Sequence, residues 1–159
     1  MNKVSLVDDV DWEFLHRFKW RTNLIKRCGN CYGTREIWNK GNRYSEHLHR
    51  VVLERKIGRK LTKKEQVDHI DGNGLNNTRN NLRLSNQCQN MANARKRKDN
   101  LTGVRGVHFN KAKNKFEVYI NKNRKRFRLG RYKTLKDATK VREEAEKKFY
   151  GEFRHVQTN

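Results

Sequence analysis

The pattern of hydrophobic and polar positions changes twice along the chain. In the first part, apolar residues recur with helical spacing after an acidic start and then gather in extended runs. The predicted elements are a helix over 8–18, strands over 19–25, 32–38 and 43–48, and a helix from 49 that ends near Gly58. Gly29 and Asn30 give a turn signal between the first two strands, which therefore form a predicted hairpin.

From Leu101 onward the pattern predicts a second small unit. Strands are expected over 103–109, 115–121 and 125–132, and Phe116, Val118 and Ile120 share one face of the middle strand. A final helix begins at Thr134, with Asp137 as its capping partner, and ends at Gly151. Its apolar stripe consists of Leu135, Ala138, Val141, Ala145 and Phe149.

The stretch between these two parts follows neither pattern. A carboxylate and an imidazole, Asp68 and His69, precede a loop rich in glycine and asparagine, and a short apolar strand follows the loop. The spacing Asn86-x-x-Gln89 is typical of a capping box. It predicts a helix that carries Asn90 in its first turn.

The charge of the chain indicates its partner. The 159 residues include 39 Lys and Arg against 17 Asp and Glu, a net charge of +22. Residues 94–133 contain 15 Lys and Arg and two acidic residues, so they contribute +13 of that total. Such a field attracts polyanions, and nucleic acid is the expected partner. A membrane is not expected, because the sequence has no apolar run long enough to span one.

The three cysteines, Cys28, Cys31 and Cys88, are an odd number and argue against a disulfide framework. The N-terminus lacks the apolar stretch of a signal peptide, so the expected location is the cytoplasm of a bacterial or phage-infected cell. A zinc site would need two ligands besides Cys28 and Cys31, and a hairpin turn is the preferred interpretation of that pair. Trp12, Trp20 and Trp38 are expected in the core.

Phosphodiester hydrolysis requires a base that activates water and a cation that stabilises the developing charge. Mg²⁺ prefers oxygen ligands and keeps several waters, so Asp68 and Asn90 can supply enough protein ligands. Successive side chains of a strand point to opposite faces, so the strand must twist or end here if Asp68 and His69 serve one site. Asp71 is expected to stabilise the loop, with metal ligation as the alternative. His49 is expected to pack, with a phosphate contact as the alternative.

Several motifs follow in order: His49-Arg50, Val67-Asp68-His69-Ile70-Asp71-Gly72-Asn73, Asn76-Asn77, Asn81-Leu82-Arg83 and Gln89-Asn90. Together they resemble the HNH homing-endonuclease family of His–metal-finger nucleases. The resemblance implies two antiparallel strands and a helix around one divalent metal. It also implies His69 as general base, Asp68 and Asn90 as metal ligands, and Asn81 as the residue that pins the loop and orients the histidine. Asn90 stands where many members have a histidine, and its amide oxygen suits Mg²⁺ or another divalent cation such as Mn²⁺.

A second set of motifs comprises Val104-Arg105-Gly106-Val107, Lys115-Phe116, Leu129-Gly130-Arg131-Tyr132 and the helix after Thr134. These resemble the Apetala-type (ethylene-response-factor) DNA-binding domain, in which the sheet lies in the major groove. The resemblance implies DNA contacts by Arg105, His108, Asn110, Tyr119, Asn121, Arg126 and Arg128. The tryptophan contacts of that family are absent here. The basic run Arg95, Lys96, Arg97 and Lys98 is expected to contact backbone phosphates, with a solvated helix end as the alternative.

The sequence thus predicts an α+β protein with three parts. A ββα-metal nuclease domain occupies 1–93, with its metal finger at about 66–93; a basic linker follows over 94–100; and an Apetala-type domain of three antiparallel strands and a helix covers 101–155. The predicted activity is that of a metal-dependent DNA endonuclease of the homing type found in phages and mobile introns. No small-molecule cofactor or obligate protein partner is expected. The alternatives are a DNA-binding regulator with a silent nuclease finger, an RNA-binding protein and a nonspecific nuclease.

Overall fold

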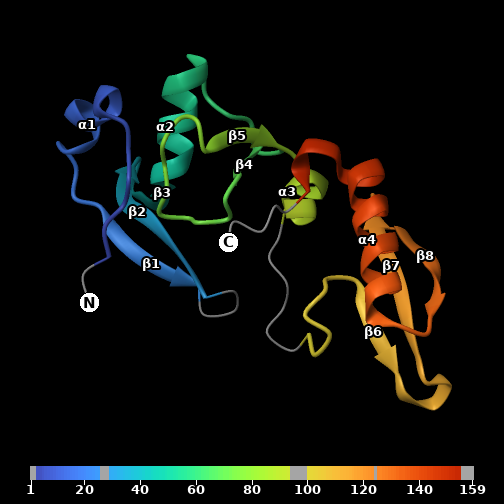
Figure 1. Ribbon diagram of the computed structural model, residues 1–159. Helices are drawn as coiled ribbons and strands as arrows, with labels where there is room; N and C mark the ends of the chain where they lie inside the picture. Colours follow the sequence, from blue (N-terminus) through green and yellow to red (C-terminus); the bar gives the residue numbers. More distant parts are fainter. Residues whose placement is uncertain (1–2, 26–28, 94–99, 124, 155–159) are drawn as a thin grey trace. The chain divides into compact units, whose positions relative to one another are not determined.

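The computed structural model describes residues 3–25, 29–93, 100–123 and 125–154. Within them, the chain forms a mixed α/β structure with three small antiparallel sheets (Figure 1). Contacts divide the chain after Asn90 into two units.

The first unit opens with a short helix and a meander of three strands. Helix α1 (Asp9–Leu15) precedes β1 (Arg21–Ile25), β2 (Asn30–Asn39) and β3 (Asn42–His47), which pair antiparallel in chain order. Lys40 and Gly41 form the two-residue turn between β2 and β3, and both have positive φ values, of 50° and 76°. Two positive φ values in a two-residue loop match the twist of the flanking strands, so this turn holds the register of the hairpin.

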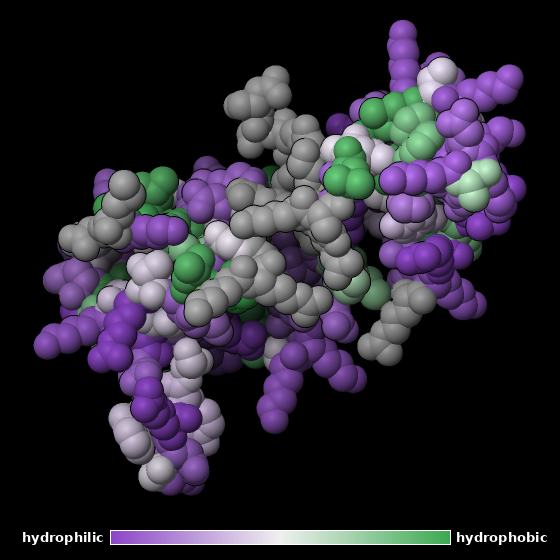
Figure 2. Space-filling view, turned by 90° about the horizontal axis from the view of Figure 1, so that it is seen from below, coloured by the Kyte–Doolittle hydropathy of each residue, from purple (hydrophilic) through white to green (hydrophobic). Residues whose placement is uncertain are grey.

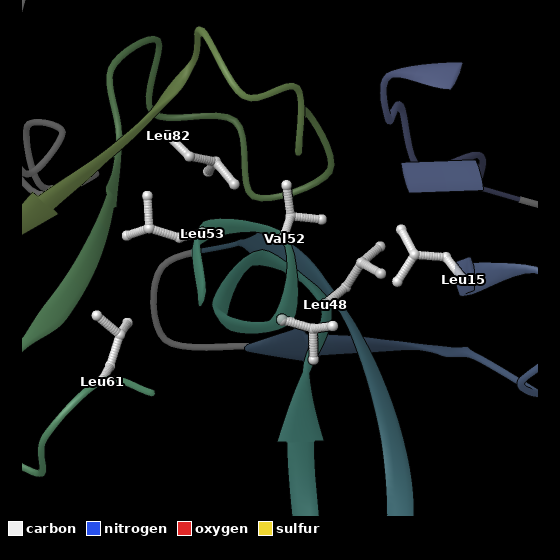
Figure 3. Packing of buried hydrophobic residues seen from close by; sticks show 7 residues of the cluster. Leu15, Leu48, Val52, Leu53, Leu61 and Leu82 are labelled. Atoms are coloured by element: carbon white, nitrogen blue, oxygen red, sulfur yellow. The ribbon is translucent and has the colours of Figure 1, made fainter. Parts of the chain in front are cut away.

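Helix α2 (Leu48–Ile57) supplies most of the core of the first unit. It starts directly after β3 and ends at Gly58 in the left-handed conformation, as the sequence predicted. Val52 and Leu53 of this helix are 0% and 2% exposed. Figure 3 shows them with Leu48 of the same helix, surrounded by Leu15, Leu61 and Leu82. The core therefore joins α1, α2 and the stretch that follows.

That stretch forms a hairpin followed by a helix. Strand β4 (Gln66–His69) pairs antiparallel with β5 (Leu82–Ser85), and α3 (Gln87–Asn93) follows. The predicted capping box is confirmed, because the amide N–H of Gln89 donates to Asn86 Oδ1 at 3.0 Å and that of Asn86 donates to Gln89 Oε1 at 2.9 Å. Residues 70–81 form the long loop that joins the two strands.

The N-terminal segment is fixed to this loop. The amide of Leu6 donates to Leu75 O, and the amide of Asn77 donates to Leu6 O, both at 2.8 Å. Asp11 is fully buried and binds the guanidinium groups of Arg55 and Arg79 at 2.7–2.9 Å. Burial raises the pKa of Asp11, but the two arginines outweigh that effect and hold the pKa below its usual value. The loop therefore has partners far from it in the sequence.

The second unit contains a three-stranded sheet and one long helix. Strands β6 (Val107–Asn110), β7 (Lys115–Lys122) and β8 (Lys125–Tyr132) pair antiparallel in chain order. Helix α4 (Leu135–Tyr150) packs on β7, where Val118 and Ile120 are fully buried. Short 3-10 turns lie at Lys111–Lys113 and Gly151–Phe153.

In the second unit, the predicted start of the first strand is wrong, and the predicted buried face of the final helix also includes a charged residue. The first strand begins at Val107 rather than at 103, because Gly103 and Gly106 have positive φ values and the chain turns there. Arg142 lies within the helical face that packs on the sheet and is 2% exposed. Its guanidinium binds Glu146 and the carbonyl of Tyr119, which explains how a charged residue is accommodated there.

The prediction that all three tryptophans lie in the core is wrong for two of them. Trp12 and Trp38 are 58% and 71% exposed, whereas Trp20 packs partly buried against the core. The buried residues of α1 are Asp11 and Leu15, while the exposed Trp12 ring stacks on His16, with centroids 5.7 Å apart. Trp38 lies in the outer half of β2, where no residue is buried.

The surface of the protein is strongly polar. Figure 2 shows a face on which hydrophilic residues predominate and hydrophobic residues form small separate areas. Among the described residues, no helix is long and apolar enough to cross a membrane.

Candidate active site

Asp68 lies in the middle of the β4–β5 hairpin and is 2% exposed. Arg83 stands opposite it in the register of the two strands. Its Nε donates to Asp68 Oδ2 at 2.8 Å, and its Nη2 lies 2.7 Å from the same oxygen. A buried carboxylate needs a cationic partner, and here the neighbouring strand provides it.

His69 is the last residue of β4, so the strand ends at the point that the sequence analysis required. Its side chain is 7% exposed. The ring of His49 lies edge-on to the ring of His69, with centroids 5.2 Å apart, and the Tyr32 ring lies at 5.9 Å. The Nε2 atom lies 3.1 Å from Asn77 Oδ1. The ring is thus held by aromatic neighbours and by one amide oxygen.

Burial lowers the pKa of His69, although the hydrogen bond to Asn77 and the carboxylates of Asp71 and Asp68 act in the opposite direction. The neutral imidazole is therefore the dominant form near pH 7. A neutral ring has the lone pair that a general base needs.

The loop after His69 is held by asparagine side chains. Asn81 Nδ2 donates to Asp71 Oδ1 at 2.9 Å and to the carbonyl of Asn76 at 2.7 Å, while Asn81 Oδ1 accepts from the amide of Asp71 at 3.1 Å. Asp71 also accepts from the amide of Asn73 and from Asn76 Nδ2, both at 2.8 Å. The expectation that Asp71 stabilises the loop is confirmed. Asn81 likewise joins the two ends of the loop.

The same loop is anchored to strand β2. Asn30 Nδ2 donates to Gly72 O at 3.0 Å, and Asn30 Oδ1 accepts from the amide of Gly74 at 3.2 Å. A Cβ atom on Gly74 would lie 2.4 Å from Cys31 O and 2.6 Å from the Tyr32 ring. Only glycine allows the two backbones to approach so closely.

Asn90 lies in α3, and its Nδ2 donates to Gln66 Oε1 at 3.0 Å. Gln66 and Asp68 are two residues apart in β4 and so share one face of the strand. Asn90 therefore stands on the face of β4 that carries Asp68. Because its amide nitrogen is committed to Gln66, its amide oxygen is the atom that it can offer to a cation.

A hard cation fits this donor set better than a soft one does. Among the described residues, no three His, Cys, Asp or Glu side chains form a cluster that could hold a metal ion. One carboxylate and one amide oxygen are the residue types that bind Mg²⁺ when water and phosphate oxygens complete its coordination. Cys31 is buried, Cys88 is exposed, and Cys28 lies outside the described residues.

His49 belongs to a stack of rings beside the site. The His47 and His49 rings lie parallel, with centroids 5.2 Å apart, and Tyr32 lies 5.6 Å from His49. Burial is the largest cause that lowers the pKa of His49, followed by His69, His47 and Arg50, and together they bring it to about 3. His49 is therefore a neutral ring that packs against His69, as the sequence analysis expected.

Most of the predicted DNA-contacting residues of the second unit share one face of its sheet. The register pairs Tyr119 with Arg128 and Asn121 with Arg126 on the face opposite to buried Val118 and Ile120. The Arg126 guanidinium lies over the Tyr119 ring at 4.4 Å. His108 and Asn110 of β6 stand opposite Glu117 and Lys115 of β7 and so belong to the same face. We call this set of residues the sheet face.

Glu117 lies among the cations of the sheet face. Arg131 Nε donates to Glu117 Oε1 at 3.0 Å, and Asn110 Nδ2 donates to it at 3.3 Å. Lys113 and Arg128 lie at 3.9 and 4.0 Å from its carboxylate. Glu117 therefore orients several of the cationic side chains on this face.

Arg105 lies apart from the sheet face. Its guanidinium donates to the backbone carbonyls of Met91 and Ala92, and it lies 5.9 Å from the Tyr150 ring. Burial lowers its pKa. The predicted phosphate-contacting run Arg95, Lys96, Arg97 and Lys98 lies outside the described residues.

Asn77, Ser5 and Arg131 belong to these sites but were not predicted from the sequence. Asn77 could have been found, because it belongs to the Asn76-Asn77 motif. Glu117 and Arg131 are neighbours across two strands, and strict alternation misplaces Arg131 because an irregularity in the pairing lies between Val118 and Tyr119. Ser5 carried no signal in the sequence.

A buried Asp-His pair at the end of a hairpin, followed by a helix with an asparagine, defines a site suited to metal-assisted hydrolysis of phosphodiesters. Comparison with known proteins also indicates a similarity to nucleases. Residues 46–92 match the sequence model of a family described as HNH endonuclease. The chain therefore carries a region similar to an HNH endonuclease domain, and the site lies within it.

One relative is an uncharacterized HNH endonuclease of Acanthamoeba polyphaga mimivirus. It is 32% identical over 106 residues, which are 67% of this chain and 54% of the relative. The chain thus spans about half the length of that relative. No solved structure matches the chain significantly.

Proposed function

We propose that the protein is a metal-dependent DNA endonuclease of the homing type. The observation that carries this proposal is the placement of Asp68, His69 and Asn90 around the β4–β5 hairpin, within the region that matches the HNH endonuclease family. HNH nucleases generally use divalent metal ions, and the two oxygen donors here suit such an ion. The expected substrate is duplex DNA, as the positive charge of the chain favours.

In this proposal His69 takes the proton from the attacking water. Its neutral ring, fixed by Asn77 and by the His49 and Tyr32 rings, does not need to rotate before it accepts that proton. Asp68 and Asn90 would hold the divalent cation, which would supply stabilisation of charge on the phosphate and on the leaving oxygen. Asn81 and Asp71 keep the loop closed, so that the end of β4 stays in place.

The sheet face of the second unit is proposed to bind the duplex and to choose the site of cleavage. A sheet can enter the major groove, and exposed arginines there can contact bases and phosphates. Arg126, Arg128 and Arg131 lie on this face, while α4 covers the other. The side chains of Arg126 and Arg128 are exposed and can therefore reach a bound duplex.

A supercoiled-plasmid assay tests the nuclease. The protein is incubated with Mg²⁺, with EDTA, and as the His69→Ala variant, on a generic plasmid and on one that carries a sequence selected by the protein. We expect nicked or linear product that requires Mg²⁺ and disappears in the variant, while DNA affinity changes by no more than a few-fold. Tight binding to the selected sequence without cleavage would contradict the proposal and would favour a DNA-binding regulator. Equal loss of binding and cleavage in the variant would remove His69 from the base role.

A further inference from the structure

A chain of three hydrogen bonds leads from the N-terminal segment to His69. Ser5 Oγ donates to the carbonyl of Leu75 at 3.1 Å, and Asn77 Nδ2 donates to Ser5 Oγ at 2.7 Å. The other atom of the Asn77 carboxamide, Oδ1, lies 3.1 Å from His69 Nε2. Asn77 is 0% exposed, so its orientation is set entirely by these neighbours.

The direction of each hydrogen bond follows from the first one. A carbonyl oxygen can only accept, so the single proton of the Ser5 hydroxyl is donated to Leu75 O. Ser5 Oγ must then accept from Asn77, which places the NH₂ group toward Ser5 and the oxygen toward His69. An amide oxygen accepts as well, so the His69 nitrogen that faces it carries the proton.

We infer that Ser5 and Asn77 are positioning residues that fix His69 as the tautomer protonated on Nε2. The neutral imidazole then has its lone pair on Nδ1, and Nδ1 is the atom that accepts the proton from water. Only the role of Nδ1 as the acceptor of the proton from water rests on the proposed nuclease function. The tautomer itself follows from the hydrogen bonds.

The backbone keeps this chain of hydrogen bonds in register. Leu6, next to Ser5, donates to Leu75 O and accepts from the amide of Asn77, both at 2.8 Å. The N-terminal segment therefore lies as a short parallel bridge along the loop. Asp8 accepts from the amide of Arg79 at 2.6 Å and holds the segment at its other end. Ser5 has little freedom to move away from Asn77.

Nothing in this arrangement requires an asparagine for packing alone. A buried carboxamide is costly unless both of its ends are bonded, and here one end meets Ser5 and the other meets His69. An apolar residue of similar size would fill the space without defining which imidazole nitrogen holds the proton. Partners that act through a catalytic or metal-binding group in this way change activity by about 10–100-fold when removed.

Nitrogen NMR of the imidazole rings tests the inference directly. The full-length protein is labelled with ¹⁵N in its histidine rings, and the His69 signals are assigned by their loss in His69→Gln. The variants are Asn77→Ala, Asn77→Asp and Ser5→Ala, with Thr78→Ala as a matched control. Thr78 lies in the same loop and donates to Asn76. The Thr78→Ala substitution therefore removes one loop hydrogen bond but leaves the hydrogen bonds among Leu75, Ser5, Asn77 and His69 intact. Single-turnover cleavage and DNA affinity are measured on the same proteins.

In the unsubstituted protein we expect a protonated Nε2 and an unprotonated Nδ1 on His69. Asn77→Ala should give mixed tautomers and cleavage slowed about 10–100-fold at unchanged DNA affinity. Asn77→Asp keeps an acceptor for Nε2–H and should retain the tautomer. Ser5→Ala should shift the tautomer in the same direction as Asn77→Ala, but less, which keeps the test open if Asn77→Ala does not fold.

Two results would overturn the inference. One is a proton on Nδ1 of His69 in the unsubstituted protein. The other is a spectrum and a cleavage rate in Asn77→Ala or Ser5→Ala that match those of Thr78→Ala. If the unsubstituted protein does not cleave DNA at all, the proposed function fails, whereas the NMR spectra still decide whether Asn77 and Ser5 fix the tautomer.

Discussion

Asp68 and Arg83 form a buried ion pair across the β4–β5 hairpin, with Arg83 Nε and Nη2 at 2.8 and 2.7 Å from one carboxylate oxygen. The carboxylate that is proposed to hold the cation therefore already has a permanent positive neighbour. Both strands are needed for this pair, since each contributes one partner at the same register position. A bound divalent cation and the guanidinium must share the two oxygens of Asp68.

Replacing Arg83 by Met should destabilise the metal-free protein by about 3 kcal/mol, because it leaves a buried carboxylate without its guanidinium. A divalent cation should partly restore that loss, so added Mg²⁺ should stabilise Arg83→Met more than it stabilises the unsubstituted protein. Urea unfolding in EDTA and in Mg²⁺ measures both effects. Arg43→Met is the control, since Arg43 pairs with Glu36 at the surface, where a pair contributes about 1 kcal/mol or less. Equal losses in the two variants, or no added effect of Mg²⁺, would contradict the prediction.

Arg126 lies on the sheet face with its guanidinium over the Tyr119 ring, and its side chain is exposed. If it contacts a base, Arg126→Ala should weaken binding to a selected DNA sequence by about 1–3 kcal/mol more than binding to random DNA. Titrations of both duplexes at two salt concentrations measure this difference. Lys136→Ala is the matched control, because Lys136 is an exposed cation on α4. The same loss on both duplexes would show that Arg126 contacts phosphate only.

The elements around the site could be predicted because they depend on local chemistry. The Asn86 capping box starts α3 through contacts within one turn, and Gly58 ends α2 by its own left-handed conformation. Asp68 and His69 could be singled out for the same reason. They are neighbours in the chain, and the glycine-rich loop after them marks the end of a strand.

The features that were missed depend on contacts between distant segments. Ser5 and Asn77 are 72 residues apart, and their hydrogen bond exists only once the N-terminal segment lies along the loop. Trp38 is apolar enough for a core, yet it lies in the half of β2 where no residue is buried. Arg142 shows the reverse case: it is charged yet buried, because its guanidinium binds Glu146 and the Tyr119 carbonyl. Hydrophobicity alone cannot predict either outcome.

Gly74 is a position at which the loop over residues 70–81 lies directly against β2. A Cβ atom there would lie 2.4 Å from Cys31 O, so Gly74→Ala must shift backbone and should cost about 1–3 kcal/mol. Since Asn77 follows in the same loop, we expect slower cleavage as well. Gly41→Ala is the control, because it meets only the strain of a positive φ, of about 1 kcal/mol, in open space. Thermal unfolding and plasmid cleavage distinguish the two. Full activity in Gly74→Ala would show that the loop tolerates displacement.

His49 should make the stability of the protein depend on pH in a defined direction. Burial is the largest of the effects that lower its pKa from 6.5 to about 3, so the unfolded chain binds a proton that the folded chain does not. Its contribution is therefore fully present above pH 6.5 and is lost as the pH falls toward 3. Between about pH 7.5 and about pH 5.5 the expected loss from His49 is about 1 kcal/mol.

The variant His49→Phe keeps a ring beside His69 and removes the titration. The free energy of unfolding is measured in urea at the two pH values and constant salt. On acidification it should fall by about 1 kcal/mol less in His49→Phe than in the unsubstituted protein. Some pH dependence should remain, because burial also lowers the pKa values of His47 and His69. His16→Phe is the control, since His16 is exposed at the end of α1. If the two variants lose the same stability on acidification, His49 does not stay neutral in the folded protein.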